Sequence, residues 1–164
     1  MLNVLVLCTG NSARSILGEA LLDRLGEGRV QAFSAGSRPA GQVNPGALRL
    51  LQREGFDTDD FRSKSWGEFT GPDAPDIDLA ITVCGNAAGE ACPVFPGSPL
   101  RAHWGLADPA AVEGNEAQVD AAFWATWRLL RLRVEAFLAL PLETIDRSAL
   151  QIALADIGAM EGAA

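Results

Sequence analysis

The first 25 residues constrain the fold more than any other part of the chain. Residues 2–7 are almost all apolar and branched, which is typical of a strand buried on both faces of a parallel sheet. Residues 14–25 instead repeat apolar side chains at helical spacing, at Ile16, Ala20, Leu21 and Leu25. A buried strand that leads directly into a helix begins a βα unit, so this segment predicts an α/β fold.

The loop at residues 8–14 joins this strand to this helix and carries a reactive side chain at each end. The backbone N–H groups of such a loop, together with the positive end of the helix, favour an oxyanion and stabilise a thiolate. Cys8 is therefore a candidate nucleophile, and Arg14 offers a planar fork for two oxygens of a ligand. Ser15 can donate a hydrogen bond to the sulfur anion. The alternative is a buried strand-end cysteine beside a solvated arginine.

The whole loop would surround the oxyanion, because open α/β sheets hold their ligands at the carboxyl ends of the strands. The predicted binding residues are Thr9, Gly10, Asn11, Ser12, Ala13 and Arg14. Gly10 and Asn11 tolerate positive φ best. A chain that wraps closely round a ligand is expected to need that conformation.

The rest of the chain alternates strands and helices. The predicted strands are residues 29–34 and 77–83, and the predicted helices are residues 45–54, 116–139 and 143–158. Glycine and proline mark residues 67–76 and 93–99 as loops, the second a candidate mobile segment. This order predicts a three-layer α/β/α sandwich around a parallel sheet of about four strands. Residues 1–140 would form the domain, and residues 141–164 would be a helical extension of it.

Size and charge exclude several classes of protein. A chain of 164 residues is most simply one domain. Its net charge of −8 argues against a nucleic-acid partner, and it would repel an anionic substrate at long range, so local donors must outweigh it. The chain starts directly in a strand, without a leader pattern or an apolar run of the ~20 residues that span a membrane. These features predict a cytoplasmic protein with no membrane partner.

Two more cysteines could react with Cys8. Cys84 ends a predicted parallel strand at the same edge of the sheet, where neighbouring strands lie ~4.8 Å apart. If residues 84–92 were helical, Cys84 and Cys92 would stand ~12 Å apart, whereas a disulfide needs Cα atoms within about 7 Å. A bond between them would require unwinding, which Gly85 and Gly89 ease. The alternative makes Cys84 a core thiol and Cys92 an ordinary loop residue.

No metal site is predicted. The three cysteines and the single histidine, His103, could in principle form a zinc site. Their spacing is against it, because the chain has no Cys-x2-4-Cys pair and Cys8 is far from the others. His103 beside Trp104 is more often structural than catalytic. Asp-Pro pairs such as Asp108-Pro109 begin many ordinary turns, so the pair alone does not indicate a catalytic acid.

The Cys-Thr-Gly-Asn-Ser-Ala-Arg-Ser sequence at residues 8–15 resembles the phosphate-binding loop of the low-molecular-weight protein tyrosine phosphatase superfamily. Its Cys-Thr-Gly-Asn-Ser opening is similar to that of the arsenate reductase branch. Residues 33–36, 82–93 and 103–110 resemble further segments of that branch in the same order. The similarity spans about residues 2–140, and the combination is far more specific than any one segment.

This resemblance implies an enzyme that reduces arsenate to arsenite, with phosphate or sulfate as mimics of the substrate. Cys8 would attack arsenate while Asp108 protonates the leaving oxygen. Cys84 would then attack the sulfur of Cys8, and Cys92 would attack Cys84. Thioredoxin, or glutathione with glutaredoxin, would reduce the final disulfide, so no bound cofactor is expected.

Two other functions use the same loop. A phosphatase of this superfamily would hydrolyse a phosphate monoester through a cysteinyl-phosphate. Such phosphatases resemble each other in having aromatic residues beside the pocket, whereas this chain has Ala110 after Asp108-Pro109 and no tyrosine. The third possibility is an oxyanion-binding protein without turnover. The cysteine positions and the small residues favour the reductase.

The resemblance also implies a potassium site that occurs in some of these reductases. Asn11, Glu19 and Ser34 fall at the positions of its ligands. Residues 62–65 provide lysine and serine where an aspartate is expected. We therefore do not predict tight binding of potassium, and Glu19 is equally a helix residue hydrogen-bonded to the loop.

Overall fold

The computed structural model describes residues 1–85 and 95–164, and it contains a parallel sheet of four strands in the order β2-β1-β3-β4. The strands are β1 (Leu2–Cys8), β2 (Val30–Gly36), β3 (Leu79–Thr82) and β4 (Leu100–His103). The first three confirm the predicted strands. The sequence did not predict β4 individually, because a half-exposed edge strand of four residues is too short to show a clear pattern.

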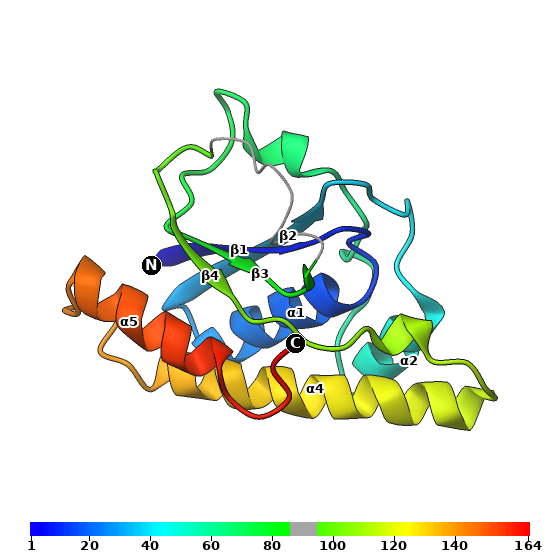
Figure 1. Cartoon of the computed structure of the whole chain (residues 1–164). Helices are drawn as coiled ribbons and strands as arrows, with labels where there is room; N and C mark the ends of the chain where they lie inside the picture. The colour runs from blue at the N-terminus through cyan, green and yellow to red at the C-terminus, as the bar shows by residue number, and fades with distance from the viewer. Residues whose placement is uncertain (86–94) are drawn as a thin grey trace.

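Four α-helices lie together on one face of the sheet (Figure 1). They are α1 (Arg14–Gly26), α2 (Pro45–Arg53), α4 (Glu116–Leu138) and α5 (Arg147–Gly158). Their starts follow from local sequence, since side chains of Asn44, Asn115 and Asp146 cap the first turns of α2, α4 and α5. Two short 3-10 helices, η1 (Trp66–Phe69) and η2 (Pro109–Ala111), complete the described helices. η1 lies partly in the predicted loop at residues 67–76.

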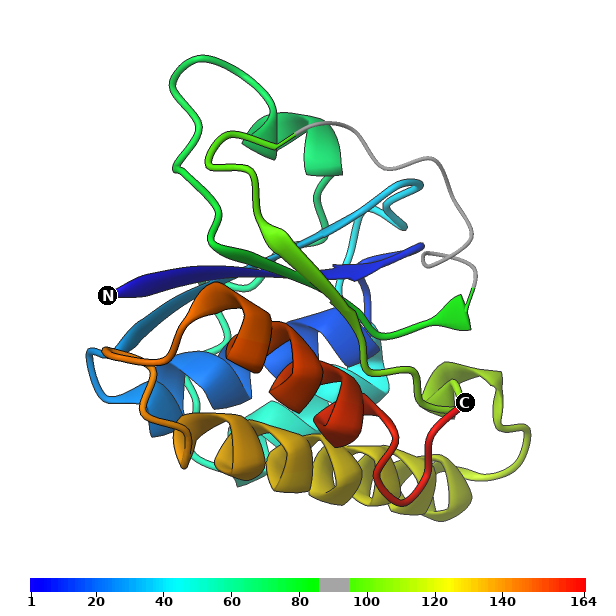
Figure 2. The ribbon, with the colours of Figure 1, turned by 60° about the vertical axis from the view of Figure 1, so that its left-hand side comes forward.

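The sheet has an apolar core on each face, because alternate residues of β1 point to opposite sides. Val4 and Val6 belong to the larger core, which the helices cover, and Leu5 and Leu7 belong to the smaller one. The apolar stripe of α4 is buried in the larger core: Phe123, Trp127, Leu130, Val134 and Phe137. η1 and irregular chain cover the smaller core in the described residues (Figure 2). The predicted α/β class with a four-stranded parallel sheet is confirmed.

Helix α5 packs against the edge strand β4 and against α4 (Figure 2). The side-chain amide of Gln151 donates to the carbonyl of Arg101 over 3.0 Å, and the indole of Trp104 donates to the carbonyl of Leu154 over 3.2 Å. Within residues 1–85 and 95–164, none of the helices has the length and apolar composition needed to cross a bilayer.

Candidate active site

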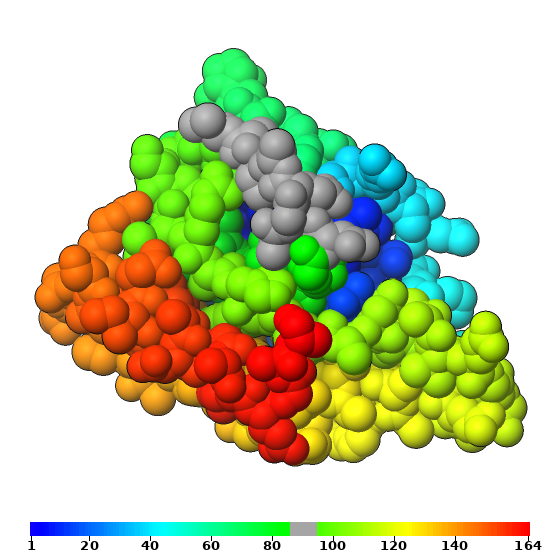
Figure 3. Space-filling view, in the orientation of Figure 1, coloured from blue at the N-terminus to red at the C-terminus, as the bar shows by residue number. Residues whose placement is uncertain are grey.

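A pocket of about 170 Å³ opens at the carboxyl ends of β1 and β3. Its lining contains most of the predicted site residues: Cys8, Thr9, Gly10, Ser12, Ala13, Arg14, Cys84 and Asp108, together with Ala110. Asn11 and Ser15 are fully buried next to this lining. Cys92 lies outside the described residues. In the space-filling view, blue N-terminal residues reach the surface between the cyan chain after β2 and the yellow-green chain around η2 (Figure 3).

Hydrogen bonds from outside hold the carbonyl groups of the 8–14 loop away from the pocket. The carbonyls of Thr9, Gly10 and Ser12 accept from the backbone N–H groups of Arg38, Ala40 and Asn44 over 3.0, 2.9 and 2.8 Å. In a planar trans peptide, the N–H points opposite to the C=O. The next N–H groups along the loop therefore face inward, where they can bind an oxyanion.

Asn11, which is buried, fixes the shape of the loop by its hydrogen bonds. It has the positive φ expected of it, 45°. Its side-chain Nδ2 donates to Ser15 Oγ over 2.8 Å, and its Oδ1 accepts from the backbone N–H of Lys64 over 2.9 Å. Ser15 therefore keeps its own hydroxyl hydrogen to donate. Gly10 does not have a positive φ, so that expectation was wrong: a single left-handed residue is enough to turn the loop.

Gly36, at the end of β2, allows the loop to pass close to the sheet. A Cβ atom at this position would clash with the carbonyl oxygen of Thr9 and would lie 2.8 Å from that of Cys8. Both neighbours are backbone atoms, which cannot move aside as a flexible side chain can. This contact gives a physical reason for the glycine that ends the segment at residues 33–36.

We expect Gly36→Ala to damage both the loop and the stability of the protein. The added methyl group must push the loop outward, which should lower the affinity for phosphate at least about tenfold and destabilise the fold by about 1–3 kcal/mol. Calorimetric titration with phosphate and urea unfolding measure the two effects. Gly71→Ala is the matched control, because a Cβ there meets nothing within 4 Å. Unchanged phosphate binding in Gly36→Ala would contradict the argument.

Arg14 spans the pocket from α1 to the chain after β4. Its Nη1 donates to the carbonyl of Leu106 over 2.7 Å, and its Nη2 lies 3.6 Å from Oδ2 of Asp108. Its Nε is buried and has no hydrogen-bond partner within the described residues. The guanidinium is thus oriented by fixed acceptors on one edge, while Nε remains as a donor for a ligand oxygen.

Asp108 sits at the mouth of the pocket in a defined orientation. Its Oδ1 accepts from the N–H of Ala110 over 2.9 Å and so caps η2, which leaves Oδ2 toward Arg14. The side chain of Asp108 is 42% exposed, against 13% for Arg14. A half-exposed carboxyl group beside the pocket can exchange protons with solvent and with a leaving oxygen.

The two described cysteines both line the pocket. Cys8 and Cys84 are 6% and 4% exposed, and Thr9 Oγ1 lies 3.6 Å from Cys84 Sγ. The hydrogen bond with Cys84, and next burial, raise the pKa of the Cys8 thiol, whereas the Arg14 guanidinium and the Gly10 N–H lower it. Because two negative charges repel each other in this buried space, the two thiols cannot both be ionised at neutral pH.

Removing Cys84 should therefore make Cys8 more acidic. In Cys84→Ala, the group that raises the pKa of Cys8 most is gone, while Arg14 and the helix end remain. We expect the pH midpoint of Cys8 alkylation by iodoacetamide to fall, with faster alkylation at pH 7. Mass spectrometry of the peptide that contains Cys8 separates this reaction from alkylation of other cysteines. Cys84→Ser keeps a hydrogen-bonding group, so its midpoint of Cys8 alkylation should lie between those of Cys84→Ala and the unmodified protein. A midpoint that moves upward in Cys84→Ala would refute the coupling.

The residues named for a potassium ion do not fit one, because Lys64 brings its own positive charge. The Lys64 ammonium lies 3.7 Å from Oε1 of Glu19 and 3.4 Å from Oγ of Ser34. Burial raises the pKa of Glu19 and lowers the pKa of Lys64, and the attraction between the two opposes both shifts. Elsewhere in the described residues, no group of three His, Cys, Asp or Glu side chains could hold a metal ion.

Sequence reasoning missed the residues that hold the loop from outside. Ser63 Oγ donates to the carbonyl of Gly10 over 3.0 Å, and Leu106 binds Arg14 through its carbonyl. Backbone acceptors and donors leave no mark in a sequence. From the sequence, Ser63 and Lys64 were considered only because they differ from the residues of a potassium site. That difference was the one signal in the sequence that this segment has another role beside the loop.

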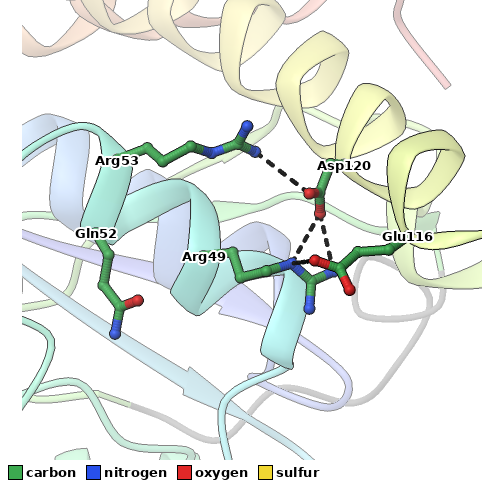
Figure 4. A pocket seen from close by; sticks show the side chains of 5 residues that line it. All are labelled: Arg49, Gln52, Arg53, Glu116 and Asp120. Atoms are coloured by element: carbon green, nitrogen blue, oxygen red, sulfur yellow. Dashed lines mark hydrogen bonds and ion pairs between the residues drawn. The ribbon is translucent and has the colours of Figure 1, made fainter.

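A larger pocket of about 410 Å³ lies between α2 and α4 (Figure 4). Its charged groups neutralise one another: Arg49 Nη2 lies 2.8 Å from Asp120 Oδ1 and its Nε lies 3.5 Å from Glu116 Oε1, and Arg53 Nη2 lies 3.6 Å from Asp120 Oδ2. Among the described residues that line this pocket there is no nucleophile. The described thiols lie instead in the smaller pocket, at Cys8 and Cys84.

Comparison with known proteins agrees with this geometry. The family model for low molecular weight phosphotyrosine protein phosphatases matches residues 3–150. An arsenate reductase of Bacillus licheniformis is 37% identical over 118 residues, which cover 71% of this chain and 81% of the relative. A solved arsenate reductase in its phosphate-binding state aligns with a TM-score of 0.68 at 26% identity, covering 85% of this chain and 98% of that one. The thioredoxin-dependent arsenate reductase of Corynebacterium glutamicum aligns with a TM-score of 0.54 at 26% identity, covering 82% of this chain and 62% of that one. The chain therefore belongs to the family of low molecular weight phosphotyrosine protein phosphatases.

Proposed function

We propose that this protein reduces arsenate to arsenite. The observation that carries the proposal is that two cysteines, Cys8 and Cys84, line one oxyanion pocket. A phosphatase needs one thiol and water, whereas a reductase needs a second thiol close to the first. The curated relative and the solved structures that are named arsenate reductases support the same reading.

In the first step, the Cys8 thiolate attacks arsenic and an oxygen leaves as water. The inward N–H groups of the loop and Nε of Arg14 bind the remaining oxygens and stabilise the charge of the transition state. Asp108 gives a proton to the leaving oxygen. The product is a thiol-arsenate adduct that still contains arsenic(V).

In the second step, the sulfur of Cys84 attacks the sulfur of Cys8. The Cys8–Cys84 disulfide forms, the sulfur–arsenic bond breaks, and its electron pair leaves with arsenic as arsenite. Two thiols are oxidised while arsenic(V) becomes arsenic(III), so the electrons balance. Cys92 then attacks Cys84 and releases the Cys8 thiolate. An external dithiol reduces the Cys84–Cys92 disulfide that remains.

The walls of the pocket favour a small oxyanion over an aryl phosphate. Among the described residues, the lining of the pocket of about 170 Å³ has Ala110 beside Asp108 and contains no aromatic side chain. A phenyl ring would therefore find no aromatic surface on which to stack. Arsenate needs only hydrogen-bond donors around it, and the loop supplies these.

Thioredoxin is the reductant that we favour, with glutathione and glutaredoxin as the alternative. The relay through Cys84 and Cys92 ends in a disulfide within one chain, and a dithiol protein reduces such a bond without a mixed intermediate that persists. One solved relative is thioredoxin-dependent by its description. We place the protein in the cytoplasm, because the reducing conditions there keep cysteines as thiols.

A coupled assay tests the proposal. Purified protein with thioredoxin, thioredoxin reductase and NADPH should oxidise NADPH only after arsenate is added. Cys84→Ser should lose this turnover and still bind phosphate, because Cys84 acts after the oxyanion is bound.

Other outcomes point to other functions. Rapid hydrolysis of p-nitrophenyl phosphate without arsenate-dependent oxidation would replace the reductase by a phosphatase. Phosphate binding without either activity would indicate a binding protein. Turnover with glutathione and glutaredoxin alone would support arsenate reduction but contradict the proposed role of Cys92.

A further inference from the structure

The segment at residues 159–164 runs from the end of α5 to the chain that borders the pocket. Figures 1 and 2 both place the C-terminus beside the chain between β4 and η2. The N–H of Ala164 donates to the carbonyl of Gly105 over 2.9 Å. A Cβ on Gly105 would clash with the backbone oxygen of Ala164, so the two backbones approach each other more closely than a residue with a side chain would allow.

His103 joins this segment to the sheet. Its Nε2 lies 3.1 Å from the carbonyl oxygen of Ala164, and its Nδ1 lies 2.8 Å from Oγ1 of Thr82. A carbonyl can only accept, so Nε2 must carry the hydrogen. In the neutral ring, Nδ1 then accepts from the Thr82 hydroxyl. The imidazole thus bridges β3 and the terminal segment from the surface of β4.

The terminal segment is itself anchored to α4. The guanidinium of Arg133, fully buried, donates to the carbonyl of Met160 over 3.0 Å. Arg128 lies 3.5 Å from Glu161 in an exposed ion pair. Residues 159–164 are thus held by two contacts to α4 and by two contacts to His103 and Gly105. We call this segment the strap; it lies against the chain that leads to Leu106 and Asp108.

The strap lies one residue from the group that orients Arg14. Leu106 follows Gly105, its N–H donates to the carbonyl of Val83 over 3.2 Å, and its carbonyl accepts from Arg14 over 2.7 Å. Asp108 is two residues further along. A shift of Gly105 would move both the acceptor of the guanidinium and the acid at the mouth of the pocket.

We propose that the strap at residues 159–164, through His103 and Gly105, positions the Arg14 guanidinium for oxyanion binding. His103 is a positioning residue in this scheme and does not touch substrate. The inference rests on the proposed function for its link to catalysis, but oxyanion affinity measures it independently.

Two substitutions of the exposed His103 separate its contacts. In His103→Gln, the side-chain N–H₂ can still reach Ala164, whereas in His103→Asn the shorter amide keeps only the contact with Thr82. Loss of one hydrogen bond corresponds to about a two- to tenfold change. We expect the dissociation constant for phosphate and the KM for arsenate to rise by that factor in His103→Asn, with kcat changed less. His103→Gln should stay near the unmodified protein.

A deletion of residues 159–164 should weaken phosphate binding at least as much as His103→Asn. Ile152→Ala, on the exposed face of α5, is the control and should change nothing. Equal phosphate affinities in His103→Asn and His103→Gln would overturn the proposal, and so would normal affinity in the deletion. If the deletion does not fold, the two histidine variants still decide. Weaker phosphate binding in a protein that never reduces arsenate would reject the proposed function and keep the strap.

Discussion

Cys8→Ser should abolish arsenate reduction while phosphate still binds. The hydroxyl of serine is not ionised at neutral pH and cannot form a disulfide, so neither the first nor the second step can occur. We expect kcat to fall roughly 10⁴-fold or more, as when the nucleophile of a serine protease is removed. The coupled NADPH assay measures the loss.

Phosphate affinity is the control for this variant. The donors that bind the oxyanion are backbone N–H groups and Arg14, and serine leaves them in place. Calorimetry should therefore give a dissociation constant within about threefold of the unmodified protein. Residual NADPH oxidation at more than a few per cent would mean that another thiol starts the reaction.

Arg14→Lys should have the second largest effect, although the charge is kept. Lysine has no planar fork, so it cannot bind the carbonyl of Leu106 and a ligand oxygen together in one fixed geometry. Loss of one such donor set in the transition state lowers rates by about 10²- to 10³-fold. We expect kcat/KM for arsenate to fall by that factor. The affinity for phosphate should also fall, but by less.

The matched control is Arg49→Lys, in the ion-pair cluster between α2 and α4 (Figure 4). That arginine is also paired with a carboxylate, since its Nη2 lies 2.8 Å from Oδ1 of Asp120. Its replacement should leave kcat/KM unchanged. An Arg14→Lys enzyme with normal kcat/KM would show that charge alone, without the fork, serves the reaction.

Much of this fold could be predicted because its local signals are strong. β1 is an unbroken apolar strand, and α4 has a capping box at Asn115 and a buried stripe that ends before Pro141. The 8–14 loop can be recognised in the sequence because a cysteine and an arginine stand at the two ends of a strand-to-helix connection. Such features depend on residues that are neighbours in sequence.

The rest depends on contacts between distant residues. The pairing of Lys64 with Glu19, the closeness of Gly36 to the carbonyl of Thr9, and the carbonyl of Leu106 beside Arg14 each join segments that are far apart in the chain. No periodicity encodes them. The second pocket thiol was predicted at the correct edge of the sheet, but its effect on the acidity of Cys8 follows only from burial of both sulfurs.

The contact between α5 and β4 also bears on the exposed edge of the sheet. β4 is the last strand of the sheet, and the outer backbone groups of an edge strand can pair with a strand of another molecule. Gln151 binds the carbonyl of Arg101 and Arg147 binds that of Ser98, so side chains of α5 occupy acceptors along this edge. Helix α5 thus shields the protein against edge-to-edge aggregation.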